Sequence, residues 1–149
     1  MENSKENNFE TTLSKLRKVE FQLKAILDNI PDIAWLKDVQ GRFIAVNDSF
    51  VKACGYKVEE IIGKTDLDIW PRELALSYRA DDQDVMDSKK RKCVQERLLY
   101  QEGGEQWIET IKTPLFDNQN NVIGTTGIAR NITVYKNEAE RLKEIRGEL

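Results

Sequence analysis

The chain has 149 residues, of which 40% are hydrophobic, 33% charged and 8% aromatic, with a formal net charge of −3 and no histidine. This length suits a single globular domain whose core needs neither a disulfide framework nor a structural metal. Without histidine, the chain cannot build a Ser-His-Asp or Cys-His nucleophile pair, bind haem through imidazole, complete a Cys/His zinc site or carry a phosphohistidine.

The first predicted element is an amphipathic helix that ends at Pro31. Its apolar residues recur at spacings of four and three and form a narrow seam: Phe9, Leu13, Leu16, Leu23, Leu27 and Ile30. Proline removes a backbone donor and disfavours helix at the residue before it, so the helix should stop at Ile30. Five basic and five acidic side chains in residues 1–30 suit a solvated helix surface.

Short apolar runs separated by turn residues follow. Residues 33–36 and 42–46 predict two strands around a turn that ends at Gly41. Short helices are predicted over 50–54 and 58–62, each followed by a glycine that suits a helix C-terminus. Asn47, Asp48 and Ser49 are all suitable N-caps for the first of them. Residues 64–71 are too broken for a long element, and a longer helix is predicted from about Arg72 to Ser88.

The last third of the chain is strand-like. Residues 93–100 and 106–116 flank a glycine-containing hairpin, and residues 122–132 follow a polar turn. The tail repeats the heptad pattern and predicts a closing helix. The expected order is therefore helix, two strands, three helices, three strands, helix.

Charge and cysteine content restrict the partners and the compartment. The cluster 89–92, Lys-Lys-Arg-Lys, follows an acidic stretch and is interpreted as a solvated loop, so nucleic acid is not an expected partner. Cys54 and Cys93 form neither a CxxC pair nor a secreted disulfide framework, which favours a cytoplasmic location. The longest uncharged stretch, 118–129, is too short and too polar to span a membrane.

Several motifs in order resemble the PAS domain family over about Leu27 to Lys136. They are Asn29-Ile30-Pro31-Asp32, Lys37-Asp38-x-x-Gly41-Arg42-Phe43, Val46-Asn47, Gly55-Tyr56, Glu59 to Lys64, Thr65-Asp66-x-Asp68-x-x-Pro71, Tyr78 to Asp82, Trp107, Lys112 to Leu115, and Gly127 to Thr133. The resemblance implies an α+β fold with a five-stranded antiparallel sheet in the order 2-1-5-4-3, short helices on one face and amphipathic helices at both ends. It divides the chain into an N-terminal helix (1–27), a sensor domain (28–133) and a C-terminal signalling helix (134–149).

The family usually ends its last strand with Asp-Ile-Thr, whereas this chain has Asn131-Ile132-Thr133. Asparagine can accept a hydrogen bond and cap a helix, but it has no charge for a salt bridge. These three residues are the expected signal-coupling joint between the sensor and the closing helix.

The cofactors that the family uses can be tested against the sequence. The absence of histidine excludes His-ligated haem, and Met86 is interpreted as core filling. Light-sensing flavin relatives place a reactive cysteine where this chain has Asp66, so covalent flavin–thiol photochemistry is disfavoured. Cys54 and Cys93 are interpreted as small buried hydrophobes. The ligand is therefore none or an unknown small molecule.

Asp66 and Asp68 lack a third ligand at convincing spacing for a metal, and no metal or catalytic residue is predicted. Asp66 is expected to cap a short helix, and one of the two aspartates to meet a lysine. Lys37 shares a strand face with Trp35, so it should lie at the pocket edge. There it needs an acidic partner or an anionic ligand, unless it is simply solvated.

Strand alternation and the place of the family's cavity suggest a set of pocket residues. They are Trp35, Lys37, Ile44, Val46, Phe50, Ile62, Ile69, Trp70, Leu74, Tyr78, Ile108, Thr110, Thr125 and Gly127. The alternative is that these residues are only core. Trp107 is predicted to face either the outer helix or a dimer partner.

The expected function is a non-enzymatic sensory module of a multidomain signalling protein. The resemblance implies the input region of a histidine kinase that senses a small ligand or mediates dimerisation. The alternatives are the input domain of a diguanylate cyclase, phosphodiesterase or transcription regulator, and a ligand-free dimerisation module. Expected partners are a second copy, through Leu13, Leu16, Leu23 and Leu27, and a downstream output domain.

Overall fold

The computed structural model describes residues 1–99 and 105–147. Eleven elements follow one another in this part of the chain: α1 (Glu2–Asn29), β1 (Ile33–Asp38), β2 (Phe43–Val46), α2 (Asp48–Cys54), α3 (Val58–Ile61), α4 (Asp66–Ile69), α5 (Arg72–Ser88), β3 (Lys92–Leu99), β4 (Glu105–Phe116), β5 (Val122–Asn131) and α6 (Thr133–Arg146). The predicted hairpin tip and the last residues of the predicted tail lie outside the described residues.

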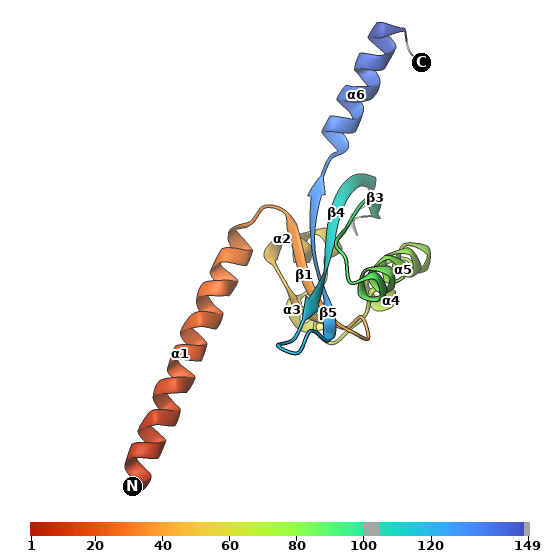
Figure 1. Cartoon of the computed structure of the whole chain (residues 1–149). Coiled ribbons are helices and arrows are strands. Elements are labelled where there is room, and N and C mark those ends of the chain that lie inside the picture. Colours follow the sequence, from red (N-terminus) through yellow and green to blue (C-terminus); the bar gives the residue numbers. More distant parts are fainter. Residues whose placement is uncertain (100–104, 148–149) are drawn as a thin grey trace.

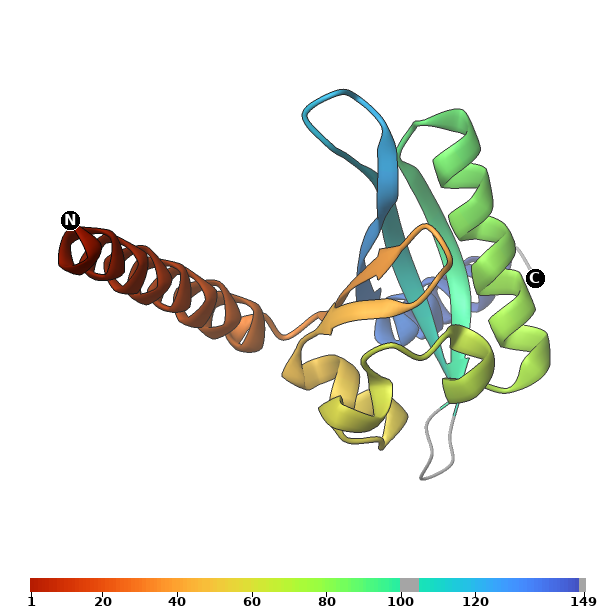
Figure 2. The ribbon, with the colours of Figure 1, turned by 90° about the horizontal axis from the view of Figure 1, so that it is seen from below.

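The strands form one antiparallel sheet in the order β2-β1-β5-β4-β3, which confirms the predicted α+β fold and strand order. Helices α2 to α5 cover one face of this sheet, while α1 and α6 project away from it as two separate arms (Figures 1 and 2). The core therefore lies between the sheet and the four inner helices.

Asn47 ties the first helix to this core. Its Oδ1 accepts the N–H groups of Phe50, which caps α2, and of Ala34 in β1, at 3.1 and 3.0 Å. Its Nδ2 donates to the carbonyl oxygens of Leu27 and Asp32, at 3.0 and 2.8 Å. This one buried amide thus fixes the end of α1, the start of β1 and the start of α2, which explains why asparagine is needed among the three predicted caps.

The first helix agrees with the predicted range 1–27 to within two residues. Two other local predictions need correction. The expected order counted three helices between the second and third strands, whereas the structure has four, because the short helix expected at Asp66 forms as the separate element α4. The N-cap of α4 is Thr65 rather than Asp66. The Asp68 carboxylate accepts the Thr65 N–H at 3.0 Å, so Asp66 becomes free to face the interior.

Aromatic rings dominate the core under the helices. Phe50 of α2 has edge contacts with the rings of Trp35, Phe43 and Trp70, with ring centroids 6.1, 5.1 and 5.7 Å apart. The Trp70 ring in turn meets that of Tyr78 on α5 at 6.3 Å. Such edge-to-face pairs add to the burial of apolar area and give a rigid aromatic wall.

A candidate ligand cavity and its coupling joint

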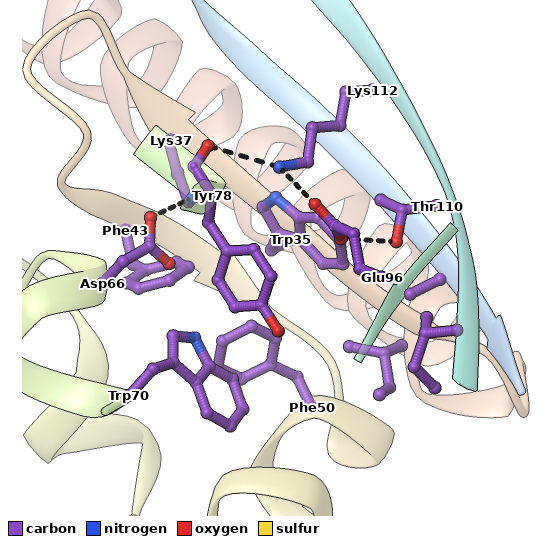
Figure 3. A pocket seen from close by; sticks show the side chains of 13 residues that line it. Trp35, Lys37, Phe43, Phe50, Asp66, Trp70, Tyr78, Glu96, Thr110 and Lys112 are labelled. Carbon is purple, nitrogen blue, oxygen red and sulfur yellow. Dashed lines mark hydrogen bonds and ion pairs between the residues drawn. The ribbon is translucent and has the colours of Figure 1, made fainter. Parts of the chain in front are cut away.

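A cavity of about 40 Å³ lies between the helices and the inner face of the sheet (Figure 3). The residues that line it combine aromatic rings with charged groups: Ile33, Trp35, Lys37, Phe43, Phe50, Asp66, Trp70, Tyr78, Glu96, Ile108, Thr110, Lys112 and Ala129. Several of these side chains carry an ammonium, a carboxyl or a hydroxyl group, so the cavity wall is not an ordinary apolar core.

Lys37 on β1 is buried, with 2% of its side chain exposed, and its Nζ lies 2.6 Å from both Asp66 Oδ2 and Asp82 Oδ2. Burial lowers the pKa of Lys37, but the attraction of these carboxylates outweighs it, so the pKa is raised and the ammonium stays charged. Burial raises the pKa of Asp66, although Lys37 opposes that shift. The predicted acidic partner of Lys37 is confirmed, and the interpretation of Lys37 as solvated is wrong.

A second buried lysine, Lys112 on β4, is held more loosely. Its Nζ lies 3.4 Å from Asp82 Oδ1, 3.4 Å from Glu96 Oε1 and 3.3 Å from the Tyr78 carbonyl oxygen. Charge-assisted hydrogen bonds of ammonium groups are usually nearer ~2.8 Å. Lys112 is only 1% exposed, so its donors have no compensating access to bulk water.

Glu96 on β3 completes the charged wall. Its Oε2 accepts the Thr110 hydroxyl at 2.9 Å, while among the described residues Oε1 accepts no hydrogen bond. Burial raises the pKa of Glu96; Lys112 opposes this shift, whereas the neighbouring Asp81 carboxyl adds to it. The carboxyl group therefore sits in an environment where a proton is easily taken up.

Trp35 places its indole N–H at the same end of the cavity, on the side of Lys112 and Glu96 (Figure 3). Its Nε1 is buried and has no hydrogen-bond partner within the part of the chain that the structure describes. Gly127 makes this position available, because a Cβ there would lie 2.2 Å from Trp35 Cζ2 and 2.8 Å from Nε1. Gly127 thus lets the ring lie against the backbone of β5.

The structure brings together half of the predicted pocket residues. Trp35, Lys37, Phe50, Trp70, Tyr78, Ile108 and Thr110 line the cavity. The others do not: Ile44 and Ile62 are exposed, Ile69 and Thr125 are buried elsewhere, Val46 and Leu74 pack against the core, and Gly127 supports Trp35.

Ile44 misses the cavity because a bulge interrupts the pairing of β1 with β2. Leu36 pairs with Ala45 but Lys37 pairs with Phe43, which leaves Ile44 as the extra residue, 50% exposed. The alternation is reset, so Phe43 faces inward in its place. Ile62 follows the last turn of α3, whose inward-facing residue is Ile61.

Sequence reasoning missed Ile33, Phe43, Asp66, Glu96, Lys112 and Ala129 as lining residues. Lys112 follows Thr110 by two positions on β4, so strand alternation places it on the inner face. Glu96 lies opposite Ile108 in the register of β3 and β4. A signal for both was therefore present, but charged residues are normally expected in water.

The remaining predicted residues fall in several places. Cys54 is buried in α2 as predicted, whereas Cys93 is exposed because it points outward from β3, which corrects that prediction. Met86 is partly buried. The basic cluster is mostly solvated, but Lys92 opens β3 and pairs with Asp81 at 3.0 Å. No group of three metal-binding side chains occurs among residues 1–99 and 105–147.

The joint between β5 and α6 is built from hydrogen bonds to Trp107. Asn131 Oδ1 accepts the Thr133 N–H at 2.9 Å and so orders the turn that leads into α6. The N-cap of α6 is nevertheless Ile132, without a side-chain cap bond, so the predicted capping role of asparagine is not borne out. The Trp107 backbone N–H donates to Thr133 Oγ1 at 2.9 Å, and its carbonyl accepts the Ile132 N–H at 2.9 Å. Lys136 Nζ lies 3.6 Å from the centroid of the Trp107 ring, a cation–π contact. Trp107 therefore faces the outer helix, one of its two predicted orientations.

Both flanking helices leave their apolar seams exposed. No residue of α1 is buried, and Leu16 and Leu23 are 62% and 56% exposed. The described part of α6 likewise has no buried residue. Leu13 and Leu27 are partly covered, the latter near the contact of α1 with Asn47.

The sheet order, the helices on one face and the enclosed cavity define a PAS domain. The family model described as PAS fold matches residues 27–137, and the chain belongs to this family.

Among curated proteins, the methanogenesis regulatory histidine kinase FilI of Methanothrix harundinacea (strain 6Ac) is 27% identical over 131 residues. These cover 87% of this chain but only 15% of that protein. Among solved structures, a phage VqmA–DPO complex is similar with a TM-score of 0.68 and 27% identity, over 87% of this chain and 61% of that one. The PAS domain of Bordetella pertussis BvgS matches with a TM-score of 0.67 and 18% identity, over 89% and 99%.

In the described residues, every helix is too short or too polar to cross a bilayer.

Proposed function

We propose that the chain is a non-catalytic sensory input module of a larger signalling protein, and that this protein is a histidine kinase. The observation that carries this proposal is the cavity, whose wall holds a loosely contacted buried ammonium and, among the described residues, an unpartnered indole N–H. Buried polar groups are normally satisfied, and those that are not often mark a functional site. A ligand that satisfies them would shift the domain toward the geometry it prefers.

The route from cavity to output runs along β4. Thr110 and Lys112 contact the cavity region, and Trp107 on the same strand holds Ile132, Thr133 and Lys136. A small movement of β4 would therefore reach α6 through backbone and side-chain bonds. If the α6 helices of two copies form a coiled coil with two discrete packings, such a movement can switch the coil from one packing to the other.

The exposed seam of α1, with Leu13, Leu16, Leu23 and Leu27, supports a homodimer in which α1 and α6 meet their copies. In this assignment, residues 1–27 are the dimer helix, 28–133 the sensor and 134–149 the signalling helix. The kinase output is supported by the likeness to FilI, of which this chain spans 15%. The likeness to phage VqmA in complex with DPO favours a ligand-binding rather than a purely structural role.

The test uses the full-length parent protein and an insertion of one residue after Thr133. The matched control is a one-residue insertion after Asn120, in the exposed turn between β4 and β5. We expect the first insertion to uncouple output while the domain stays folded, and the second to leave regulation intact. Unaltered regulation after the Thr133 insertion would contradict the proposal. Native mass spectrometry and an absorption spectrum of fresh protein then show whether a metabolite or a chromophore is bound.

A further inference from the structure

We propose that the cavity selects a small uncharged ligand group that carries a hydrogen-bond acceptor next to a hydrogen-bond donor, as a primary amide does. The acceptor would face Trp35 Nε1 and Lys112 Nζ, and the donor would face Glu96 Oε1. This inference rests on the proposed sensory function and specifies the chemistry of the same site.

The first argument is the pattern of unused hydrogen-bonding groups. Among the described residues, the buried donor Trp35 Nε1 and the buried acceptor Glu96 Oε1 form no hydrogen bond, and Oε1 has only an ion-pair contact of 3.4 Å with Lys112 Nζ. Lys112 Nζ lies 3.3 to 3.4 Å from its three oxygen neighbours, contacts long enough for a better-placed acceptor to replace one of them. Both donors and the acceptor belong to side chains that line the same cavity. Only a group that accepts and donates satisfies both kinds of atom at once.

The second argument is charge. The buried cluster contains two ammonium groups, Lys37 and Lys112, and three carboxyl groups, Asp66, Asp82 and Glu96. With all five ionised, the cluster already has one excess negative charge. An anionic ligand would add a second charge in a region of low dielectric unless Glu96 took up a proton. Because burial raises the pKa of Glu96, an anion would bind together with a proton on this carboxyl and its affinity would fall as the pH rises, whereas an uncharged ligand requires no proton.

The third argument is size and access. A cavity of about 40 Å³ is roughly three times the 10–15 Å³ that one water molecule needs by the same measure, so it suits a group of a few non-hydrogen atoms. Tyr78 and Glu96 also line a surface groove between α5 and β3. These two side chains therefore separate the cavity from the groove, and a larger ligand would have to displace them to occupy both.

The test compares three probes of equal size, each with four non-hydrogen atoms: acetamide, acetone and acetate. Acetamide accepts and donates, acetone only accepts, and acetate is an anion. Each is titrated at pH 8 into the ¹⁵N-labelled chain, and the Trp35 indole N–H resonance is followed after assignment with Trp35→Phe. We expect acetamide to shift this resonance with an affinity at least about five-fold higher than that of the other two.

Variants separate binding from general packing. Lys112→Met should weaken acetamide binding at least about ten-fold, because it removes a charged donor while keeping a side chain of similar length. Thr125→Val is the matched control, since Thr125 is buried and its hydroxyl has no partner among the described residues, yet it does not line the cavity. We expect unchanged affinity in that variant.

Tighter binding of acetate at pH 8, or equal binding of acetone and acetamide, would overturn the inference. So would the absence of any shift of the Trp35 resonance with acetamide. None of these results bears on the insertion after Thr133, so the sensory function can stand when the ligand chemistry proposed here fails.

Discussion

Replacing Lys37 by methionine should destabilise the fold more than its conservative shape suggests. The substitution removes an ammonium whose Nζ is 2.6 Å from Asp66 and from Asp82, with the side chains of the three residues 2%, 2% and 6% exposed. At an effective dielectric constant of about 20, each contact corresponds to roughly 6 kcal/mol of attraction before the cost of burying the charges is counted. Breaking a buried pair by removing one partner typically costs about 3–5 kcal/mol, because the remaining carboxylates stay buried and unpaired.

The loss of stability caused by Lys37→Met should depend on pH. In the variant, the attraction of Lys37 no longer opposes the upward shift that burial imposes on the pKa of Asp66, so this carboxyl takes up a proton more readily. The difference from the natural chain should therefore be largest near pH 7 and shrink as the pH falls toward 4. Urea unfolding followed by tryptophan fluorescence measures both the free energy of unfolding and its pH dependence.

Lys24→Met is the matched control, since Lys24 forms a solvated pair with Asp28 at 2.9 Å on α1. Such exposed pairs contribute little, and we expect a change within about 0.5 kcal/mol. A loss below about 1 kcal/mol for Lys37→Met at pH 7 would refute the reasoning, because the buried carboxylates would then have found solvent or another partner.

Three further outcomes follow from the structure. The folded chain binds a proton on Glu96 at higher pH than the unfolded chain, so the free energy of unfolding should fall as the pH rises above 4.5. In urea unfolding, Glu96→Gln should make this pH dependence weaker. An unchanged pH dependence would mean that another group causes it. Gly127→Ala should cost about 1–3 kcal/mol and move the Trp35 indole resonance, because its Cβ overlaps the ring; an unshifted resonance would contradict that contact. Leu16→Asp with Leu23→Asp should shift the sedimentation coefficient to that of a monomer, and a persistent dimer would place the interface elsewhere.

The order of elements was predictable because periodicity and turn residues act locally. The helix over Arg72–Ser88 coincides with the predicted range, and the strands differ from it by a few residues at most. The bulge at Ile44 was not predictable in this way. It depends on the register between β1 and β2, which no local pattern specifies, and it changes which side chains face the cavity.

The sequence predicted those features of the candidate site that follow from the alternation of side chains along a single strand. Alternation placed Lys37 beside Trp35, and the high cost of an unpaired buried ammonium predicted an acidic partner. Asp66 belongs to the pair Asp66 and Asp68, one of which was predicted to meet a lysine. Asp82 lies 45 positions beyond Lys37, and its contribution depends on how α5 is rotated against the sheet. That rotation is a tertiary property of packing, so the sequence contains no direct sign of it.

The buried charges bear on the proposed sensory function, because they divide into a tightly joined part and a loosely joined part. Lys37, Asp66 and Asp82 are joined by short contacts that fix β1 against α4 and α5. Lys112 and Glu96 are joined by a longer contact across β4 and β3, and Asp82 links the two groups. A ligand that draws Lys112 toward itself would therefore move β4 more readily than β1. Because Trp107 on β4 holds the start of α6, the loosely bonded half of the cluster is also the half connected to the outgoing helix.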